Sequence, residues 1–165
     1  MFNFRKYNNV TSITFPNNVR MVNTNFSNAF YNMRNLQMIN FNHPNVTNMT
    51  STYYDCTNLT GSPVCSDKVN NMYSAYYNCT NLIGSPVCGD NVINMAGTYM
   101  YCSNLTGNPV CGDKVTNMTS TYSGCSSLTG NPVCGNNVTN MGQTYYRCFN
   151  LTGSPVCGDK VTNMF

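Results

Sequence analysis

The sequence lacks the side chains that acid–base catalysis normally uses. It has no glutamate, its five acidic residues are all aspartates, and its single histidine is His43. There are no paired carboxylates and no glycine-rich phosphate loop, so general acid–base chemistry has no evident residues to carry it. A cysteine nucleophile would need His43, which precedes the regular part of the chain and has no evident orienting partner. We therefore do not expect an enzyme.

Charged residues are also scarce, at 8% of the chain, and the net charge is +3. The eight Lys and Arg residues are scattered, and no basic run exceeds two residues. A nucleic-acid groove needs a denser basic patch, so we expect no nucleic-acid partner. Hydrophobic residues make up 41% of the chain, and this composition with so little charge argues against disorder.

Long apolar runs are missing as well. None approaches the ~20 residues that a membrane-spanning helix needs, so we expect no membrane insertion. Met1–Lys6 is not typical of a signal peptide, because polar Tyr7, Asn8 and Asn9 follow immediately. Export would need a leader or domain outside this sequence, or a non-secretory route such as assembly into a virus particle. We expect an extracellular location, on a cell surface or on a virion.

What the sequence does contain is a 23-residue period from about residue 33 to the C-terminus. A leucine series beginning at Leu59 and a valine series beginning at Val46 keep this step. All ten cysteines follow it in two series, Cys56, Cys79, Cys102, Cys125 and Cys148, then Cys65, Cys88, Cys111, Cys134 and Cys157. A fixed period of this length predicts a solenoid, in which each coil buries its apolar side by stacking on its neighbours.

The apolar spacing within the units predicts short strands. Leu36, Ile39 and Phe41 stand at offsets 0, +3 and +5, which is the leucine-rich-repeat strand signature. The same spacing and its later equivalents predict seven strand positions, near Val10, Leu36, Leu59, Leu82, Leu105, Leu128 and Leu151. With adjacent strands roughly 4.8 Å apart, the stack would be about 30 Å long.

The repeated motif V-T-N-M, followed by an aromatic residue, Cys and Leu, resembles the BspA-like leucine-rich repeats of bacterial surface proteins. It stands at Val46–Met49, Tyr53, Cys56 and Leu59, recurs in every later unit, and has a related form around Pro16. The resemblance implies a right-handed leucine-rich-repeat solenoid with short parallel strands and little regular helix, and it implies adhesion. We expect one domain over residues 1–165, made of an N-terminal cap (1–9), two divergent repeats (10–45) and five near-identical repeats (46–165).

One feature departs from this family. From Leu59 onward the +3 position is Ser or Asn, as at Ser62, and a proline follows, as at Pro63. Because proline removes one strand N–H in each coil, we expect the sheet to be short or broken there. Inward Ser or Asn would need hydrogen-bond partners along the stack. The family frame also points Val64 inward and Cys65 outward, whereas strict alternation from Leu59 would reverse them; we favour the family frame.

The cysteines are not spaced as metal ligands. The two in one unit lie nine residues apart, without a C-x-x-C pair or histidine partners. An extended segment separates Cys56 from Cys65, which opposes a disulfide within the unit. Disulfides between equivalent cysteines of adjacent coils are geometrically possible, but five in a series would leave one unpaired. We favour columns of small, buried thiols in both series.

Two polar series have structural interpretations. Asp67, Asp90, Asp113 and Asp159 could suggest calcium, but Asn136 interrupts them and no second carboxylate lies nearby, so we expect no calcium. We expect no other cofactor. The asparagines of the V-T-N-M motif are expected to form a hydrogen-bonded ladder along the coil: Asn48, Asn71, Asn94, Asn117, Asn140 and Asn163.

Variation between the units is concentrated before the first cysteine. Pairs such as Thr50-Ser51 and Tyr54-Asp55 change from unit to unit, while the strand segment is nearly constant. These positions flank the inward Met and Tyr, so we expect them to be exposed. Their Tyr, Ser, Gly and Asn content is typical of antibody paratopes, although a solvent-facing loop that tolerates any residue would vary too. The candidate binding residues are Tyr54, Tyr73, Tyr77, Tyr101, Tyr146 and Arg147.

The two ends of the chain differ. Phe2, Phe4 and Tyr7 precede the first strand and could cap that end, whereas Val161–Phe165 opens a unit that stops before its cysteine. We expect self-association through residues 151–165, weakened by Phe165→Asp. The sequence thus favours a binding or adhesion module that contacts a protein or a glycan. The alternative is a structural spacer or assembly component that stacks end to end.

Overall fold

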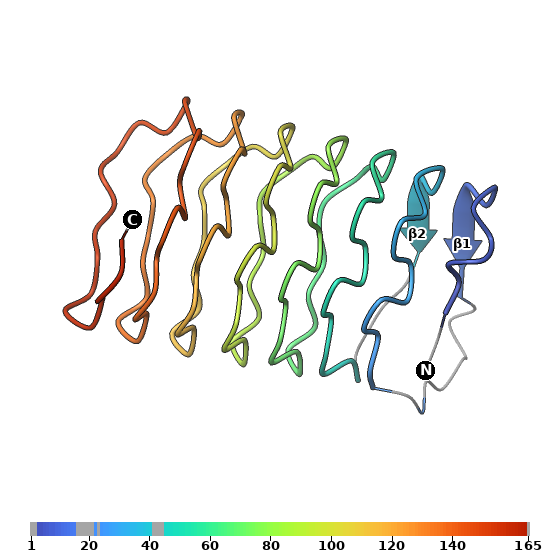
Figure 1. Ribbon diagram of the computed structural model, residues 1–165, viewed down its shortest axis with the longest axis horizontal. Helices are drawn as coiled ribbons and strands as arrows, with labels where there is room; N and C mark the ends of the chain where they lie inside the picture. The colour runs from blue at the N-terminus through green and yellow to red at the C-terminus, as the bar shows by residue number, and fades with distance from the viewer. Residues whose placement is uncertain (1–2, 16–21, 23, 41–44, 165) are drawn as a thin grey trace.

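A computed structural model describes residues 3–15, 22, 24–40 and 45–164. The chain winds into coils that stack side by side along the long axis of the molecule, with the two termini at opposite ends (Figure 1). The described part of the chain contains no helix and only short strands. The expectations for Phe2, Pro16, Phe41, His43 and Phe165 lie outside the described residues.

Two parallel strands form where the first two strand positions were predicted. β1 (Ser12–Thr14) pairs with β2 (Met38–Asn40), so that Ile13 lies opposite Ile39. At the later positions the described residues contain no strand, and a single bridge joins Val133 to Val156. The prediction of a broken sheet is therefore confirmed, because proline withholds its N–H.

Continuous pairing runs instead through the asparagine series. Parallel bridges join Asn25, Asn48, Asn71, Asn94, Asn117, Asn140 and Asn163 in turn. The side-chain oxygen of Asn48 accepts the N–H of Thr50 at 2.8 Å, and Asn71 does the same for Tyr73 at 2.9 Å. Such Asx turns redirect the chain immediately after the bridge. The asparagine series thus forms a ladder along the stack through its backbone, whereas the side-chain oxygens of Asn48 and Asn71 bond within their own coil and shape the turn that follows.

The segment after each asparagine is a run of turns that satisfies its backbone in two directions. Alternate N–H groups cross to the next coil, and those of Met49 and Ser51 reach the carbonyls of Asn71 and Tyr73 at 2.9 and 2.8 Å. The N–H groups between them bond back within their own coil, as Thr52 does to Met49. Every second N–H in this segment thereby ties its coil to the next one. This turn run carries the residues of the candidate binding face.

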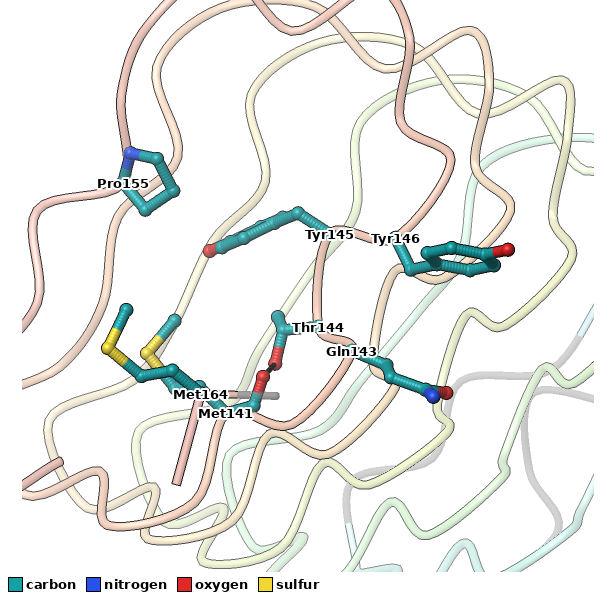
Figure 2. Close-up of a pocket in the computed structure, with 7 residues that line it drawn as sticks. All are labelled: Met141, Gln143, Thr144, Tyr145, Tyr146, Pro155 and Met164. Carbon is teal, nitrogen blue, oxygen red and sulfur yellow. Dashed lines mark hydrogen bonds between the residues drawn. The ribbon is translucent and has the colours of Figure 1, made fainter. Parts of the chain in front are cut away.

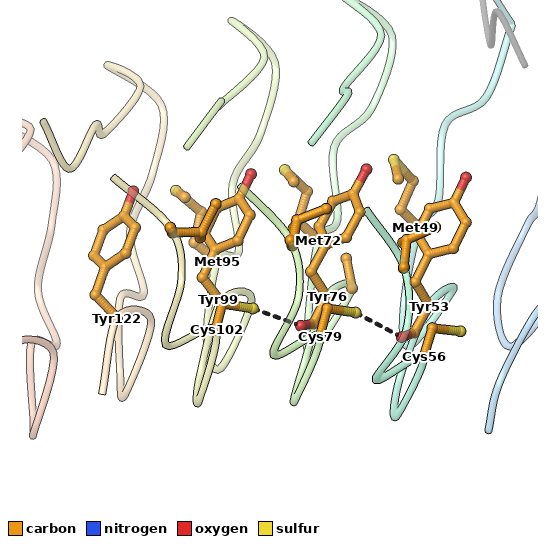
Figure 3. Packing of buried hydrophobic residues seen from close by; sticks show 14 of the residues in the cluster. Met49, Tyr53, Cys56, Met72, Tyr76, Cys79, Met95, Tyr99, Cys102 and Tyr122 are labelled. Carbon is orange, nitrogen blue, oxygen red and sulfur yellow. Dashed lines mark hydrogen bonds between the residues drawn. The ribbon is translucent and has the colours of Figure 1, made fainter. Parts of the chain in front are cut away.

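The core consists of columns of equivalent side chains, of which Figure 3 shows the Met, Tyr and Cys columns. The aromatic column stacks Phe30 on Tyr53 and continues with centroid separations of 5.0–5.9 Å through Tyr76, Tyr99, Tyr122 and Tyr145. At the N-terminal end Phe4 stacks on Phe30 at 5.3 Å. The core hydroxyls are hydrogen-bonded, because a buried tyrosine needs a polar partner. That of Tyr76 donates to the Val64 carbonyl at 2.7 Å and accepts the Val64 N–H at 3.0 Å.

All ten cysteines are free thiols. In the Cys56 series each sulfur points to a backbone carbonyl of the preceding coil: Cys79 donates to Tyr53 at 3.1 Å and Cys102 to Tyr76 at 2.9 Å (Figure 3). Burial raises the pKa of the Cys102 thiol to about 12, against a smaller opposing effect of its backbone hydrogen bond. The second series, beginning at Cys65, is half-buried against the core. The thiols therefore pack the core without cross-links.

The expected orientation of the segment after Leu59 is wrong. Val64 is 47% exposed, while Cys65 packs against the core. The neighbouring expectation fails too, since Ser62 is exposed and Pro63 is buried. The ring of Pro63 can be buried without a hydrogen-bond partner, whereas the hydroxyl of Ser62 cannot. Because side chains alternate along the segment, an inward Pro63 turns Val64 outward and Cys65 inward. The alternation that starts at Leu59 therefore prevails over the family frame.

Candidate binding face

Four tyrosines from successive coils form one row on the surface, which we call the outer tyrosine stack: Tyr31, Tyr54, Tyr77 and Tyr101. The first three follow directly after a core aromatic residue, so that the core ring points inward and its neighbour outward. Tyr31 and Tyr54 stack with centroids 4.7 Å apart and planes inclined by 7°. Tyr54 and Tyr77 are closer still, at 4.3 Å and 2°. The stack therefore presents ring edges and hydroxyls outward, because its ring faces cover one another.

The last member of the stack is turned. Tyr101 packs edge-on against Tyr77 at 5.6 Å and 84°, and it is 41% exposed. It stands one position later in its unit than Tyr77 does, because Met100 occupies the equivalent place. Its backbone has a φ of +65°, and its ring leans over Gly124, where an added Cβ would lie 2.6 Å from Tyr101 Cδ1. A small residue at Gly124 therefore makes room for this orientation.

Charged groups border the stack at its N-terminal end. The Arg5 guanidinium lies 4.6 Å above the centroid of the Tyr31 ring, a cation–π arrangement. Arg34 pairs with Asp55 at 3.2 Å, and Asn78 donates to the other oxygen of that carboxylate at 2.7 Å. Because the Arg34 side chain is largely exposed, this ion pair contributes little to stability. The ion pair offers a guanidinium to a negatively charged partner and a carboxylate to a positively charged one.

The hydroxyl of Tyr54 is a hydrogen-bonding group at neutral pH. Burial, with smaller contributions from Tyr77 and its hydrogen bond, raises the pKa of Tyr54 to about 12. The phenol of Tyr54 therefore stays protonated and can both donate and accept. The face as a whole is a polar row of phenols beside one accessible ion pair.

The six candidate residues identified from the sequence do not form a single site. Tyr54, Tyr77 and Tyr101 lie in the outer tyrosine stack. Tyr73 is 48% exposed and lies two residues after Asn71 of the asparagine bridges, outside the stack. Tyr146 and Arg147 lie further along the rod, where the guanidinium stands 5.2 Å above the Tyr146 ring.

Sequence reasoning missed Tyr31 and Arg5, and it overestimated the exposure of residues early in the turn run. Tyr31 could have been found, because it follows Phe30 as Tyr54 follows Tyr53. Ser51 and its equivalents Ser74 and Gly97 were expected to be exposed, as was Ala96, but they are buried. The prediction is wrong there because the N–H groups of Ser51, Ser74 and Gly97 cross to the next coil, which draws that part of the turn run inward.

A pocket of about 340 Å³ opens in the last coil (Figure 2). Its walls include Met141, Thr144 and Tyr145, whose equivalents in earlier coils are covered by the following coil. Tyr146 and Gln143 also line it. This pocket is an extension of the solenoid core and is separate from the outer tyrosine stack.

Among the described residues, no group of three or more His, Cys, Asp or Glu side chains could hold a metal ion. The resolved thiol shifts raise the pKa, as burial does for Cys65 to about 11, which opposes the thiolate that a nucleophile requires. None of the described segments forms a helix long and apolar enough to cross a bilayer.

Comparison with known proteins agrees with this architecture. The family model of the BspA type leucine rich repeat region matches residues 1–106 in six copies, so the chain belongs to this family. The resemblance predicted from the motifs is thereby confirmed. Searches of curated proteins and of solved structures found no significant match to the chain. Repeats of this type generally serve as non-enzymatic surface or protein-interaction modules.

Proposed function

We propose that this solenoid, right-handed as the family resemblance implies, is a non-enzymatic binding module on a cell or virion surface. Its contact face is the outer tyrosine stack. The observation that carries the proposal is the row of parallel tyrosine rings, with centroids 4.3–4.7 Å apart, beside the Arg34–Asp55 ion pair. Tyrosine supplies rigid contact area with a polar tip at low entropic cost, and it is enriched among the residues that dominate interfaces.

The geometry favours a protein ligand over a glycan. A sugar ring stacks on an exposed aromatic face, but the rings of Tyr54 and Tyr77 face each other. Their edges and hydroxyls suit the backbone and polar side chains of a polypeptide. A glycan would find an accessible ring at Tyr101, which is turned and 41% exposed. Glycan binding would therefore depend on Tyr101 alone, and protein binding on the whole stack.

Two matched triple variants test where the ligand binds. The first replaces Tyr54, Tyr77 and Tyr101 by Ser, and the second replaces Tyr73, Tyr146 and Arg147 by Ser. A panel of extracellular proteins and a glycan array are first screened with the intact chain for ligands. We expect the first variant to lose capture of a protein ligand and the second to retain it, with both folded by circular dichroism. Loss in the second variant alone would move the site away from the stack.

A second candidate function is structural, as a spacer or assembly component. The observation that favours it is the last coil, where Phe149 is 77% and Val156 is 74% exposed. We expect the 165-residue chain to self-associate through residues 151–165, which would remove these apolar side chains from water. Val156→Asp and Met164→Asp should weaken the association. Light scattering that shows a strict monomer at high concentration would exclude this function.

A further inference from the structure

Two side chains of the outer tyrosine stack lie unusually close together and parallel. Tyr54 and Tyr77 are the closest aromatic pair among the described residues, with ring centroids 4.3 Å apart and planes within 2° of parallel. The core tyrosines, by comparison, stack at 5.0–5.9 Å. Since the two rings are parallel and their centroids are only 4.3 Å apart, the carbon atoms of one phenol, its ortho carbons included, lie close to the other ring.

The backbone holds this pair in place. The N–H of Tyr53 donates to Ala75 at 2.8 Å, and that of Asp55 donates to the Tyr77 carbonyl at 2.9 Å. These two bonds bracket Tyr54 and set its Cα beside that of Tyr77. The rings can therefore rotate about their side-chain bonds, but they cannot drift apart along the rod.

We propose that Tyr54 and Tyr77 are a site of oxidative cross-linking, joined as dityrosine by a one-electron oxidant of phenols. The oxidant class is the oxidised haem of a peroxidase supplied with hydrogen peroxide. Each phenol loses one electron to the haem and one proton to water, which leaves a neutral phenoxyl radical with spin on its ortho carbons. The two radicals form one carbon–carbon bond between ortho carbons. The hydrogen on each bonded carbon then leaves as a proton and a proton returns to each oxygen, so two phenols are restored.

The overall reaction balances. The protein loses two hydrogen atoms, and one hydrogen peroxide is reduced to two waters. Because both rings are only half-buried, water can accept the phenol protons and the rings can swing from stacked to side by side as the bond forms. The product would join two adjacent coils and close a loop one repeat long, which restricts the unfolded chain as a disulfide does.

The neighbouring tyrosines are poorer sites for chemical reasons. Tyr31 carries the Arg5 guanidinium 4.6 Å above its ring, and a cation there opposes removal of an electron. In the core, the hydroxyl of Tyr76 donates to the Val64 carbonyl, which is not a base that could accept its proton. Burial also raises the pKa of Tyr76. Tyr77 and Tyr101 meet edge to face, so their ortho carbons do not face each other.

The experiment treats the dilute full-length chain with a plant peroxidase and limiting hydrogen peroxide. We expect dityrosine fluorescence in the monomer fraction, a mass lower by two hydrogen atoms, and one cross-linked peptide pair that contains Tyr54 and Tyr77. Tyr54→Phe and Tyr77→Phe keep the stacked ring but cannot form a phenoxyl radical, so each should reduce the monomer signal to that of untreated protein. Tyr73→Phe removes an exposed phenol outside the stack and should leave the signal unchanged.

Monomer cross-links that persist in both Phe variants would overturn the proposal. It would equally be overturned if all dityrosine appeared in dimers linked through exposed phenols such as Tyr7, Tyr73 and Tyr146. Circular dichroism of the variants before oxidation separates loss of the pair from loss of the fold. None of these outcomes depends on ligand binding, so they leave the proposed function untouched.

Discussion

At the scale of single residues, the molecule depends on groups that are buried in their neutral form. The thiols of the Cys56 series donate to carbonyls of the preceding coil, and the core tyrosines donate to the backbone near Val64 and its equivalents. Each group is both a packing unit and a hydrogen-bond donor. Ionisation would remove the donor and place a charge in the core.

We predict that stability falls at alkaline pH. Burial raises the pKa of Cys56 and Cys102 from 9.0 to about 12 in the folded chain. A raised pKa means that the folded state holds its proton longer than the unfolded state. The stabilisation is therefore complete below about pH 9 and is lost as the pH rises toward about 12, at up to about 1.4 kcal/mol per pH unit for each thiol.

Thermal unfolding measured across this alkaline range checks the prediction. Cys102→Ser removes one titrating thiol but keeps a donor for the Tyr76 carbonyl, so its unfolding temperature should fall less steeply with pH. A melting temperature that stays level from neutral pH to about pH 11 would show that the buried thiols do not control stability.

At the scale of the element, the turn run replaces both helix and strand. It accommodates non-glycine residues at positive φ, among them Ser51 at +50°, Asp55 at +60° and Arg147 at +61°. Such residues are strained in isolation. They are tolerated here because the N–H of Ser51, like that of Asp55, bonds to a carbonyl of the next coil.

Substitutions at two glycines distinguish the cost of backbone strain from the cost of a side-chain clash. Gly61 has a φ of +86° and open space where a Cβ would stand, whereas a Cβ at Gly124, with φ +79°, would meet Tyr101. We expect Gly61→Ala to lower the free energy of unfolding by about 1–2 kcal/mol through backbone strain. Gly124→Ala should lower it by more, and urea unfolding measures both. In a Tyr101→Ala background the excess should disappear. If it persists, Tyr101 does not pack over Gly124.

At the scale of the whole molecule, the rod is a series of columns in which each step is one repeat. Nearly every long-range hydrogen bond joins one coil to the next, so that stability is the sum of single coils and the interfaces between neighbours. The family match ends at residue 106, yet the asparagine bridges continue to Asn163. The same contacts therefore extend beyond the matched repeats.

Removal of one unit tests this periodicity. Deletion of residues 79–101 joins Asn78 to Cys102 and keeps every column in register, so we expect a folded chain that has lost about 1–3 kcal/mol of stability. Deletion of residues 79–100 is one residue shorter and shifts each later side chain out of its column. We expect that variant to lose cooperative unfolding in circular dichroism. Similar melting curves for the two deletions would contradict an additive, register-dependent stack.

Sequence alone was sufficient to predict the stack of coils and the columns of equivalent side chains within it. Residues that recur at a fixed step must lie in equivalent environments, so the Cys56 series, the asparagine series and the family could all be recognised from their spacing. The packing of free thiols followed from the odd number in each series and is what the structure shows.

The orientation of Val64, the burial of Ser51 and the turned ring of Tyr101 were decided only by tertiary structure. Each depends on what the adjacent coil presents at that point, such as an acceptor carbonyl for the Ser51 N–H or the space above Gly124. The same holds for the parallel rings of Tyr54 and Tyr77, which are one repeat apart in the sequence and meet only when the coils stack. Spacing determines which residues share a column, and contacts between coils determine which way their side chains point.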